Sequence, residues 1–377
     1  MLVLGAGLQG SACAYDLLQQ PGVERVTLAD LRPGRLPRFL QHARGKRLAT
    51  VRLNVKHAAA LRRVMRGHDA VLCALPYYFN VDVARAAVDA GVHHADLGGN
   101  TDIVAKQRRT LDKAAARQGV SVVPDCGLAP GMVNILAAEG IRRVGAAESV
   151  KVFVGGLPQR PEPPLGYQIV YSLEGALDYY TTPSRVLRDG RITRVDALSE
   201  LEDVSFPDPV GPLEAFHTGG GISTLPWAYE GKVRTMEYKT LRYPGHAAVM
   251  KAIRDLGLLD LEPIRVKGKP MVPRDAFIAA VLPRLTKPES RDLVALRVEV
   301  TGRDGRKAAW QLLDYFDEAR GISAMMRTTG YSLAITGLMQ VDGRITARGV
   351  RTPDEAVPFG EYVAELRERG MDLREVQ

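Results

Sequence analysis

Two acidic residues stand at the ends of predicted strands, a place that suits ligand binding or proton transfer. Asp96 closes the strand predicted over residues 93–97, and Asp125 follows the strand predicted over 120–123. Because parallel strands present their carboxyl ends at one edge of a sheet, both carboxylates can hold a substrate ammonium or order a water there. The alternative is that each carboxylate caps the helix that follows it.

Two basic residues later in the chain are candidates for proton transfer. Lys239 lies on a predicted antiparallel strand and would act as a base if burial depressed its pKa, although a solvated strand face is the plainer reading. His217 precedes the glycine run 219–221, where the backbone can approach a ligand closely. The alternative for His217 is a histidine whose hydrogen bonds are satisfied within a turn.

A second group of residues suits binding rather than proton transfer. Arg242, in a strand-to-helix loop with Tyr243, can hold a carboxylate through its guanidinium fork or form an ion pair within the fold. Asn134 can bond a ligand or cap the start of a helix, and Thr218 belongs to the loop after His217. Tyr171 and Glu174 precede a helix and are expected to frame the pocket or a dimer face.

A nucleotide site is predicted at the start of the chain. The apolar strand 2–4 leads into G-x-G-x-x-G and then into a helix, the arrangement in which backbone N–H groups hold a pyrophosphate. Asp30 ends the next strand twenty positions after Gly10 and can accept hydrogen bonds from a ribose, which favours NAD. Arg32 is the counter-argument, since it can receive the 2′-phosphate of NADP, and a glycine turn without nucleotide is the remaining alternative. The cofactor-binding residues expected in this loop and strand are Gly5, Gly7, Leu8, Gln9, Gly10 and Asp30.

Elements that position these residues alternate along the first third of the chain. Strands are predicted over 48–53 and 70–75, and helices over 57–66, 80–90 and 101–118. Such alternation gives a parallel sheet with helices on both faces and ligands beyond the carboxyl ends of its strands. The loops after the strands therefore supply the further expected cofactor contacts, which are Ala74, Leu75, Pro76, Gly98, Gly99 and Leu128.

The pattern changes after about residue 146 to strands in hairpins. Residues 185–188 and 191–195 flank the turn Asp189-Gly190, and a second hairpin is predicted over 292–301 and 306–316. We expect an α/β protein with a Rossmann domain over 1–130 and an α+β domain with a mixed or antiparallel sheet over 131–340. The segment from about 340 to 377, with a helix near 361–369 that stops at Gly370, is expected to pack back on the first domain.

Composition indicates a globular protein with dispersed charge. Hydrophobic residues make up 46% and charged residues 25% of 377, and the net charge of +8 is scattered rather than clustered. The three cysteines, Cys13, Cys73 and Cys126, form no CxxC pair, which favours reduced thiols. We therefore expect a cytoplasmic homodimer or higher homo-oligomer with no metal, no nucleic acid and no membrane partner.

The combination of loops resembles the saccharopine dehydrogenase-like family. The matching segments are the glycine loop with Asp30, C-A-L-P at 73–76, D-L-G-G at 96–99, G-L-A-P-G at 127–131 with Asn134, and Y-K-T-L-R-Y-P-G-H at 238–246. Within that family the pattern is most similar to that of the lysine 6-dehydrogenases, and it runs over nearly the whole chain.

The resemblance implies NAD-dependent oxidative deamination of the ε-amino group of lysine to allysine, which cyclises. Such chemistry needs a base near the nicotinamide, because the ammonium must lose a proton before hydride can leave. It also needs a cation for the α-carboxylate, a role that the resemblance gives to Arg242. The alternatives are a saccharopine or carboxynorspermidine dehydrogenase using NAD(P)H, and a nucleotide-binding scaffold without turnover.

Overall fold

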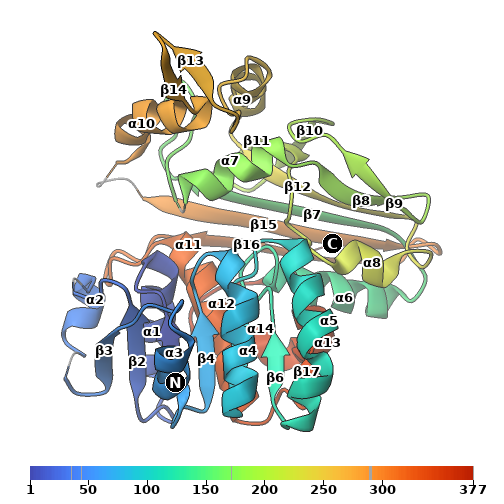
Figure 1. Cartoon of the computed structure of the whole chain (residues 1–377). Helices are drawn as coiled ribbons and strands as arrows, with labels where there is room; N and C mark the ends of the chain where they lie inside the picture. The colour runs from blue at the N-terminus through green and yellow to red at the C-terminus, as the bar shows by residue number, and fades with distance from the viewer. Residues whose placement is uncertain (35, 44, 171, 288–290, 377) are drawn as a thin grey trace.

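The computed structural model describes residues 1–34, 36–43, 45–170, 172–287 and 291–376. A parallel sheet and a larger mixed sheet lie one above the other, with helices between them (Figure 1). Tyr171 lies outside the described residues, so its predicted place at the pocket stays a prediction. None of the helices within these ranges is long and apolar enough to cross a membrane.

The nucleotide-binding sheet holds seven parallel strands in the order β17-β6-β5-β4-β1-β2-β3. Leu2 of β1 pairs with Thr27 on one side and Val71 on the other, so the strand order reverses at β1. A crevice at the carboxyl ends of the strands beside such a reversal is where this fold binds ligands. The strands are β1 (Leu2–Leu4), β2 (Val26–Asp30), β3 (Leu48–Arg52), β4 (Ala70–Cys73), β5 (His93–Asp96), β6 (Ser121–Val123) and β17 (Gly349–Val350).

Helices connect these strands, and the three predicted over 57–66, 80–90 and 101–118 form within one residue of those bounds, whereas the short α2 and η1 were not predicted. Their ends follow local sequence: Asn100 accepts hydrogen bonds from the N–H groups of Asp102 and Ile103, and Gly91 ends a helix at φ 68°. The connecting helices are α1 (Leu8–Gln19), α2 (Arg38–Gln41), α3 (Ala58–Met65), the 3₁₀ turn η1 (Tyr77–Phe79), α4 (Asn80–Ala90) and α5 (Thr101–Arg117).

The second sheet runs in the order β10-β11-β12-β7-β15-β16-β18, with β8 paired to β12 and β9 to β8. β12 and β7 are parallel and the other pairs are antiparallel, so the predicted mixed sheet is confirmed. Both predicted hairpins form, at β8–β9 and β15–β16. The strands are β7 (Ala147–Pro158), β8 (Ser184–Arg188), β9 (Arg191–Val195), β10 (Glu202–Ser205), β11 (Pro212–His217), β12 (Thr235–Arg242), β15 (Asp292–Gly302), β16 (Lys307–Tyr315) and β18 (Arg374–Val376).

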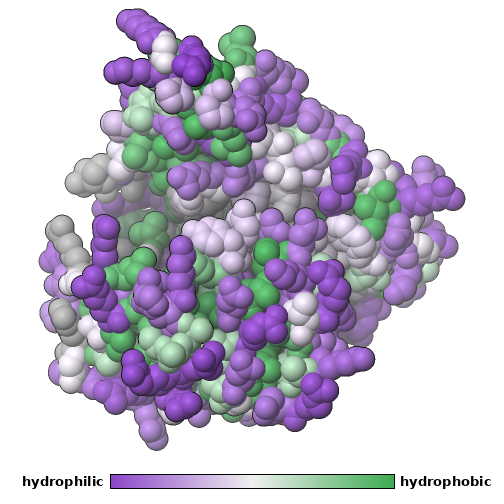
Figure 2. Space-filling model, viewed as in Figure 1, coloured by the Kyte–Doolittle hydropathy of each residue, from purple (hydrophilic) through white to green (hydrophobic). Residues whose placement is uncertain are grey.

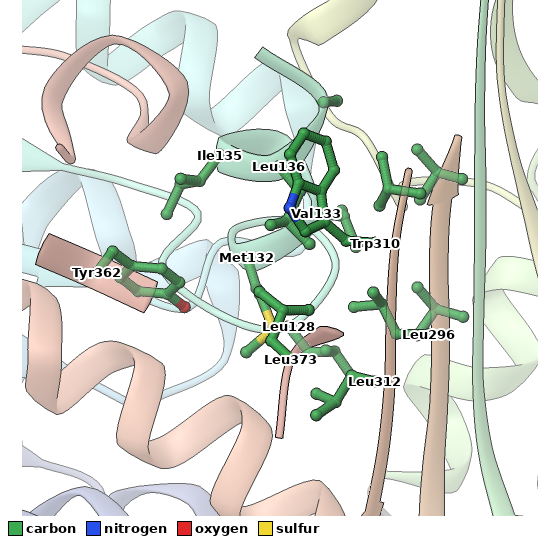
Figure 3. Close-up of a cluster of buried hydrophobic side chains, with 14 of the residues drawn as sticks. Leu128, Met132, Val133, Ile135, Leu136, Leu296, Trp310, Leu312, Tyr362 and Leu373 are labelled. Atoms are coloured by element: carbon green, nitrogen blue, oxygen red, sulfur yellow. The ribbon is translucent and has the colours of Figure 1, made fainter. Parts of the chain in front are cut away.

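The main core lies between α6 (Met132–Val144) and the second sheet. Figure 3 shows apolar side chains from α6, from strands β15 and β16 and from the C-terminal tail meeting in one cluster. Contact is close enough that a Cβ on Gly140 of α6 would lie 2.5 Å from a methyl carbon of Val300. Truncating a buried leucine such as Leu312 to alanine would cost about 2–5 kcal/mol of unfolding free energy.

The C-terminal tail returns to the nucleotide-binding domain. β17 pairs with β6, and the side-chain amide of Gln340 donates to the carbonyl oxygen of His94 at 2.9 Å. The return begins before residue 340, because α12 already packs against β4 and β5. An ion pair of 2.8 Å between Arg369 and Asp16 fixes the end of the last helix. The tail elements are α11 (Ala324–Met326), the π-helical turn η2 (Arg327–Tyr331), α12 (Ser332–Val341), α13 (Pro353–Ala356) and α14 (Phe359–Glu368).

An arm that spans residues 246–285 projects from the second sheet, at the top of Figure 1. Arg274 of the arm pairs with Asp178 and bonds the hydroxyl of Thr181, so the arm is tied to α7. Figure 2 shows the surface indented between this upper part and the nucleotide-binding domain. The remaining elements are α7 (Leu173–Thr181), α8 (Leu225–Tyr229), α9 (His246–Asp255), β13 (Ile264–Val266), β14 (Lys269–Met271) and α10 (Pro273–Leu285).

Candidate active site

The three glycines of the loop after β1 have different reasons to be glycine. Gly5 has φ 99°, and a Cβ there would lie 2.8 Å from the carbonyl oxygen of Ala74. A Cβ on Gly10 would lie 1.8 Å from the carbonyl oxygen of Gly5, so this glycine allows the helix to pack on the strand. Around Gly7, by contrast, a Cβ would meet nothing within 4 Å. Gly7 therefore leaves open the space that a pyrophosphate would fill at the start of α1.

Asp30 stands beside this loop with a fixed carboxylate. Its Oδ2 accepts a hydrogen bond of 2.8 Å from the N–H of Ala6, and its Oδ1 accepts one of 2.8 Å from the N–H of Arg32. Each oxygen keeps a lone pair for a ribose hydroxyl. The side chain of Arg32 is exposed at the same strand end. These residues fit an adenine dinucleotide, with the carboxylate in the place that reads the ribose.

Some of the other expected cofactor contacts lie beside the glycine loop, and one of them lies in the hydrophobic core. Ala74 donates its N–H to the carbonyl oxygen of Leu4, which holds the loop 74–76 against the glycine loop, with Leu75 beside Gly5. Leu8 is 54% exposed at the first turn of α1. Leu128 is instead buried in the core next to α6, which places its side chain away from the surface.

A pocket of about 300 Å³ opens between the two domains. Gly99, Asn100 and Asp102 line it from the loop after β5 and the start of α5. The opposite side comes from the second domain, with Tyr179 of α7, Arg185 of β8, Tyr238 of β12 and the turn 219–223. Because this wall follows the carboxyl end of β5, the pocket borders the crevice in which the nucleotide fits.

The two predicted catalytic carboxylates have unequal surroundings. Asp96 is fully buried, and its oxygens accept hydrogen bonds of 2.8 Å from the N–H of Gly98 and from the amide of Gln107. Burial raises the pKa of Asp96 to about 6. One oxygen of Asp96 therefore holds the turn at Gly98 and the other holds Gln107 of α5, and the catalytic role of Asp96 stays a prediction.

Asp125 lies behind the pocket wall, next to the lining residues Gly99 and Ser223. It is 1% exposed, and neither oxygen has a hydrogen bond of good geometry within the described residues. A Cβ on Gly98 would lie 1.7 Å from its Oδ1, so Gly98 makes room for the carboxylate. Burial raises the pKa of Asp125 to about 7, with Asp96 adding to the rise, whereas Ser223 and the N–H of Gly99 lower it.

Backbone conformation also marks this corner of the pocket. Asp125 has φ 63° and Ser223 has φ 45°, in the left-handed region that residues with side chains rarely adopt. Such strain persists where the surrounding structure over-determines it, and it concentrates at functional sites. Gly99 and Ser223, the neighbours of the Asp125 carboxylate, both line the pocket.

Lys239 and His217 lie on the face of the second sheet that points away from the pocket, so their predicted catalytic roles are wrong. The two residues are paired across β11 and β12, so their side chains share a face, and alternation along β12 places Tyr238 on the pocket face. The Nζ of Lys239 donates to a carboxylate oxygen of Glu202 at 2.7 Å and to the carbonyl oxygen of Glu200 at 2.6 Å. Lys239 therefore stabilises the sheet.

His217 belongs to a charged cluster on that same outer face. Its Nε2 lies 3.1 Å from a carboxylate oxygen of Glu200 and 3.8 Å from one of Glu237, and burial lowers its pKa. These three side chains are close enough to hold a metal ion, but Arg188 reaches both carboxylates at 2.8 and 2.7 Å. The guanidinium thus supplies the positive charge that a metal would supply.

Arg242 lies on the pocket face of β12 but behind the pocket wall. Its Nε donates to the hydroxyl of Tyr180 at 3.2 Å, and its guanidinium lies 4.8 Å from the ring centre of Tyr167. It is 3% exposed, and the lining residues of the pocket include Tyr238 rather than Arg242. A role for Arg242 in carboxylate binding stays a prediction.

The remaining predicted residues serve the fold around the pocket. Asn134 caps α6 by accepting from the N–H of Gly131 and ties that helix to the pocket turn by donating to the carbonyl oxygen of Ile222 at 3.1 Å. Thr218 bonds Thr240 through their hydroxyls at 2.8 Å. Tyr243 corrects its predicted place at the substrate: its hydroxyl donates to the carbonyl oxygen of Pro158, and its ring packs with the cluster on the outer face.

Several pocket residues are absent from the sequence predictions. Asp102 lies three residues beyond the D-L-G-G segment, so the sequence predicts a site in this region but not this particular residue. Ser223 lies two residues after the glycine run 219–221, the segment in which the sequence predicts a close approach of the backbone to a ligand. Arg185 lies in the predicted hairpin and Tyr238 begins the segment 238–246, but only the pairing of their strands brings both side chains to the pocket.

Comparison with known proteins identifies the family. Residues 1–123 match the saccharopine dehydrogenase NADP binding domain, and residues 127–371 match the saccharopine dehydrogenase C-terminal domain. The chain therefore belongs to the saccharopine dehydrogenase family, as the sequence resemblance predicts, and its first domain is the pyridine-nucleotide-binding domain of that family.

Solved structures agree on the fold. Apo saccharopine dehydrogenase (L-Glu forming) from Saccharomyces cerevisiae aligns with a TM-score of 0.79 at 21% identity, over 100% of this chain and 98% of that one. The homospermidine synthase from Legionella pneumophila, solved in complex with NAD, aligns with a TM-score of 0.69 at 10% identity, over 100% and 90%. At these identities the likeness shows the fold.

Sequence relatives have several different names. Saccharopine dehydrogenase [NADP(+), L-glutamate-forming] from Pyricularia oryzae is 29% identical over 70% of this chain, which spans 58% of that protein's length. Alpha-aminoadipic semialdehyde synthase from Mus musculus is 24% identical over 98% of this chain, but the match spans 47% of its length. Carboxyaminopropylagmatine dehydrogenase from Synechocystis sp. is 23% identical over 100% of this chain and 97% of its own length.

Proposed function

We propose that this protein catalyses the NAD-dependent oxidative deamination of the ε-amino group of L-lysine to allysine, with release of ammonia and NADH. The observation that carries the proposal is the charge of the pocket. Among its described lining residues, Asp102 and Asp178 are acidic and Arg185 is basic, and Asp178 is paired with Arg274. Asp102 and the buried Asp125, behind the lining residues Gly99 and Ser223, are the carboxylates with no ion pair among the described residues. Such a pocket suits a substrate with more ammonium than carboxylate groups, and lysine is one.

Position supports a redox reaction at the nucleotide-facing side of the pocket. A bound NAD would supply the acceptor for the hydride of the lysine ε-carbon. The open space at Gly7 and the carboxylate of Asp30 would hold its pyrophosphate and ribose. Asp30 favours NAD over NADP, because a 2′-phosphate would meet a carboxylate at that strand end.

Asp125 is the residue that would receive a proton. The ε-ammonium gives up one proton before hydride leaves, and the resulting iminium adds water to release ammonium and the aldehyde. A carboxyl group with a pKa of about 7 can accept that proton near neutral pH. Because Asp125 is buried, the proton would pass through the hydroxyl of Ser223, a lining residue of the pocket that neighbours the carboxylate.

A second candidate is the oxidation or reductive formation of a secondary amine such as saccharopine or carboxynorspermidine. The names of the relatives favour it, since two of them are dehydrogenases of substituted amines. Saccharopine carries several carboxylates, and these would need more cations than Arg185 among the described lining residues. The charge balance of the pocket therefore favours lysine.

The test is to mix the purified protein with NAD or NADP and with lysine, ornithine or saccharopine, and to follow NADH or NADPH by absorbance. The proposal expects turnover with lysine and NAD and slower turnover with ornithine, whose amine ends one methylene nearer the carboxylate. Turnover with saccharopine alone would establish the second candidate. Dinucleotide binding without turnover of any of the three would leave a nucleotide-binding scaffold.

A further inference from the structure

Arg185 has an unusual setting for an arginine at a domain boundary. It lies on β8, lines the pocket and is half-buried. Its guanidinium carbon lies 5.5 Å from the ring centre of Trp227, which α8 presents at 43% exposure. To the residues that the structure describes, the Arg185 side chain makes this stacking contact and neither a hydrogen bond nor an ion pair.

Neighbouring arginines differ in that the fold satisfies their donors. Arg188, three positions further along the same strand, binds the carboxylates of Glu200 and Glu237. Arg274 binds Asp178 on the adjacent helix α7. Arg185 instead has no hydrogen-bond or ion-pair acceptor among the described residues, and its guanidinium carbon lies over the indole ring of Trp227. Stacking fixes the plane of a guanidinium and leaves its edge free for a bidentate acceptor.

We propose that Arg185, oriented by Trp227, is the receptor for the carboxylate group of the amino acid substrate. The inference rests on the proposed function, because it assumes a substrate with a carboxylate at one end and an amine at the other. Arg185 comes from the second domain, whereas Gly99 and Asp125 come from the nucleotide-binding domain. A lysine held this way places its α-carbon at the second domain and its ε-carbon at the nucleotide edge. This orientation explains why the ε-amine rather than the α-amine would be oxidised.

The direct test compares lysine with 1,5-diaminopentane, which is lysine without its carboxylate. Arg185→Met should lower kcat/KM for lysine by about 10- to 100-fold, the value of one charge-assisted hydrogen bond, and should change kcat/KM for the diamine by less than about threefold. Arg185→Lys keeps the charge but loses the fork, so its effect on lysine should be intermediate. The control is Arg194→Met, because Arg194 faces Arg185 across the hairpin and is exposed to solvent.

Trp227 is a positioning residue and has its own readout. Trp227→Leu should raise KM for lysine with little change in kcat and no change for the diamine, and Trp227→Phe should restore most of the affinity, since a ring is what the guanidinium needs. Equal losses with lysine and diamine in the Arg185 and Trp227 variants would overturn the proposal. So would a full loss of lysine preference in Arg194→Met.

A binding experiment separates this inference from the proposed reaction. The chain has two tryptophans, and Trp310 is buried at 3% exposure, so Trp310→Phe leaves Trp227 as the only indole fluorophore. Lysine should change the fluorescence of Trp227 in that protein, the diamine should change it less, and Arg185→Met should abolish the difference. A carboxylate-dependent signal without lysine turnover would refute the proposed function and keep the anion receptor. Turnover of lysine with no such signal would refute the receptor alone.

Discussion

Gly7→Val separates nucleotide binding from folding. A Cβ at Gly7 meets nothing within 4 Å, and its φ of −73° suits any residue, so the free protein should keep its stability within about 0.5 kcal/mol. The added methyl groups would instead fill the space at the N-terminus of α1 that a pyrophosphate needs. The variant should therefore fold normally and fail to bind NAD.

The magnitude follows from the hydrogen bonds that would be lost. Two charge-assisted hydrogen bonds at about 1.5–3 kcal/mol each amount to about 3–6 kcal/mol, so the Kd for NAD should rise more than about 100-fold. NAD at about 100 times the wild-type Kd raises the unfolding free energy by about 2.7 kcal/mol. The same concentration would stabilise a variant with a 100-fold weaker Kd by about 0.4 kcal/mol.

Chemical unfolding with and without NAD measures both quantities. Gly22→Val is the matched control, because Gly22 also has open space within 4 Å but lies beyond the far end of α1. Gly10→Ala is the opposite control and should destabilise the free protein, since its Cβ would lie 1.8 Å from a carbonyl oxygen. Undiminished stabilisation of Gly7→Val by NAD would refute the nucleotide site at this loop.

Four further predictions concern single side chains. Asp30→Ala should narrow the preference for NAD over NADP in kcat/KM. If the wild type used both cofactors equally well, Arg32 rather than Asp30 would be the residue that contacts the adenosine ribose or its 2′-phosphate. The Asp125 carboxyl has a pKa of about 7 in the folded protein and an ordinary pKa of 3.8, so the folded state binds this proton more tightly than the unfolded state does. The stability that the proton contributes is therefore present below pH 4 and is lost as pH rises to 7. The variant Asp125→Asn cannot titrate, so its unfolding free energy relative to that of the wild type should rise across this window by up to about 1.4 kcal/mol per pH unit. The variant should also lose kcat. A difference in unfolding free energy that does not change with pH would contradict the raised pKa. Arg242→Lys should lower the unfolding free energy while KM for lysine stays within about threefold, or about 0.7 kcal/mol, and a larger rise would move the carboxylate site from Arg185 to Arg242. Lys239→Met should cost about 1–3 kcal/mol of stability and leave kcat unchanged, whereas normal stability with lost kcat would restore its predicted role as a base.

Sequence alone was sufficient for features that depend on neighbours in the chain. The glycine loop with Asp30, the hairpin turn Asp189-Gly190 and the parallel sheet all follow from short spacings and local backbone preferences. Family membership follows from the same segments, because they are contiguous in the chain. The structure adds that Gly7 is the glycine of the loop that the fold does not require, because a Cβ there would meet nothing within 4 Å.

Only the tertiary structure decided which polar groups meet at the pocket. Lys239 and His217 read as candidates from residue type, but strand parity and register placed them on the face opposite Tyr238. Arg185 and Trp227 are far apart in sequence, and the packing of α8 against β8 is what stacks them. A local pattern fixes the conformation of a segment, whereas the face that a side chain presents depends on long-range pairing, and no short sequence pattern encodes that pairing.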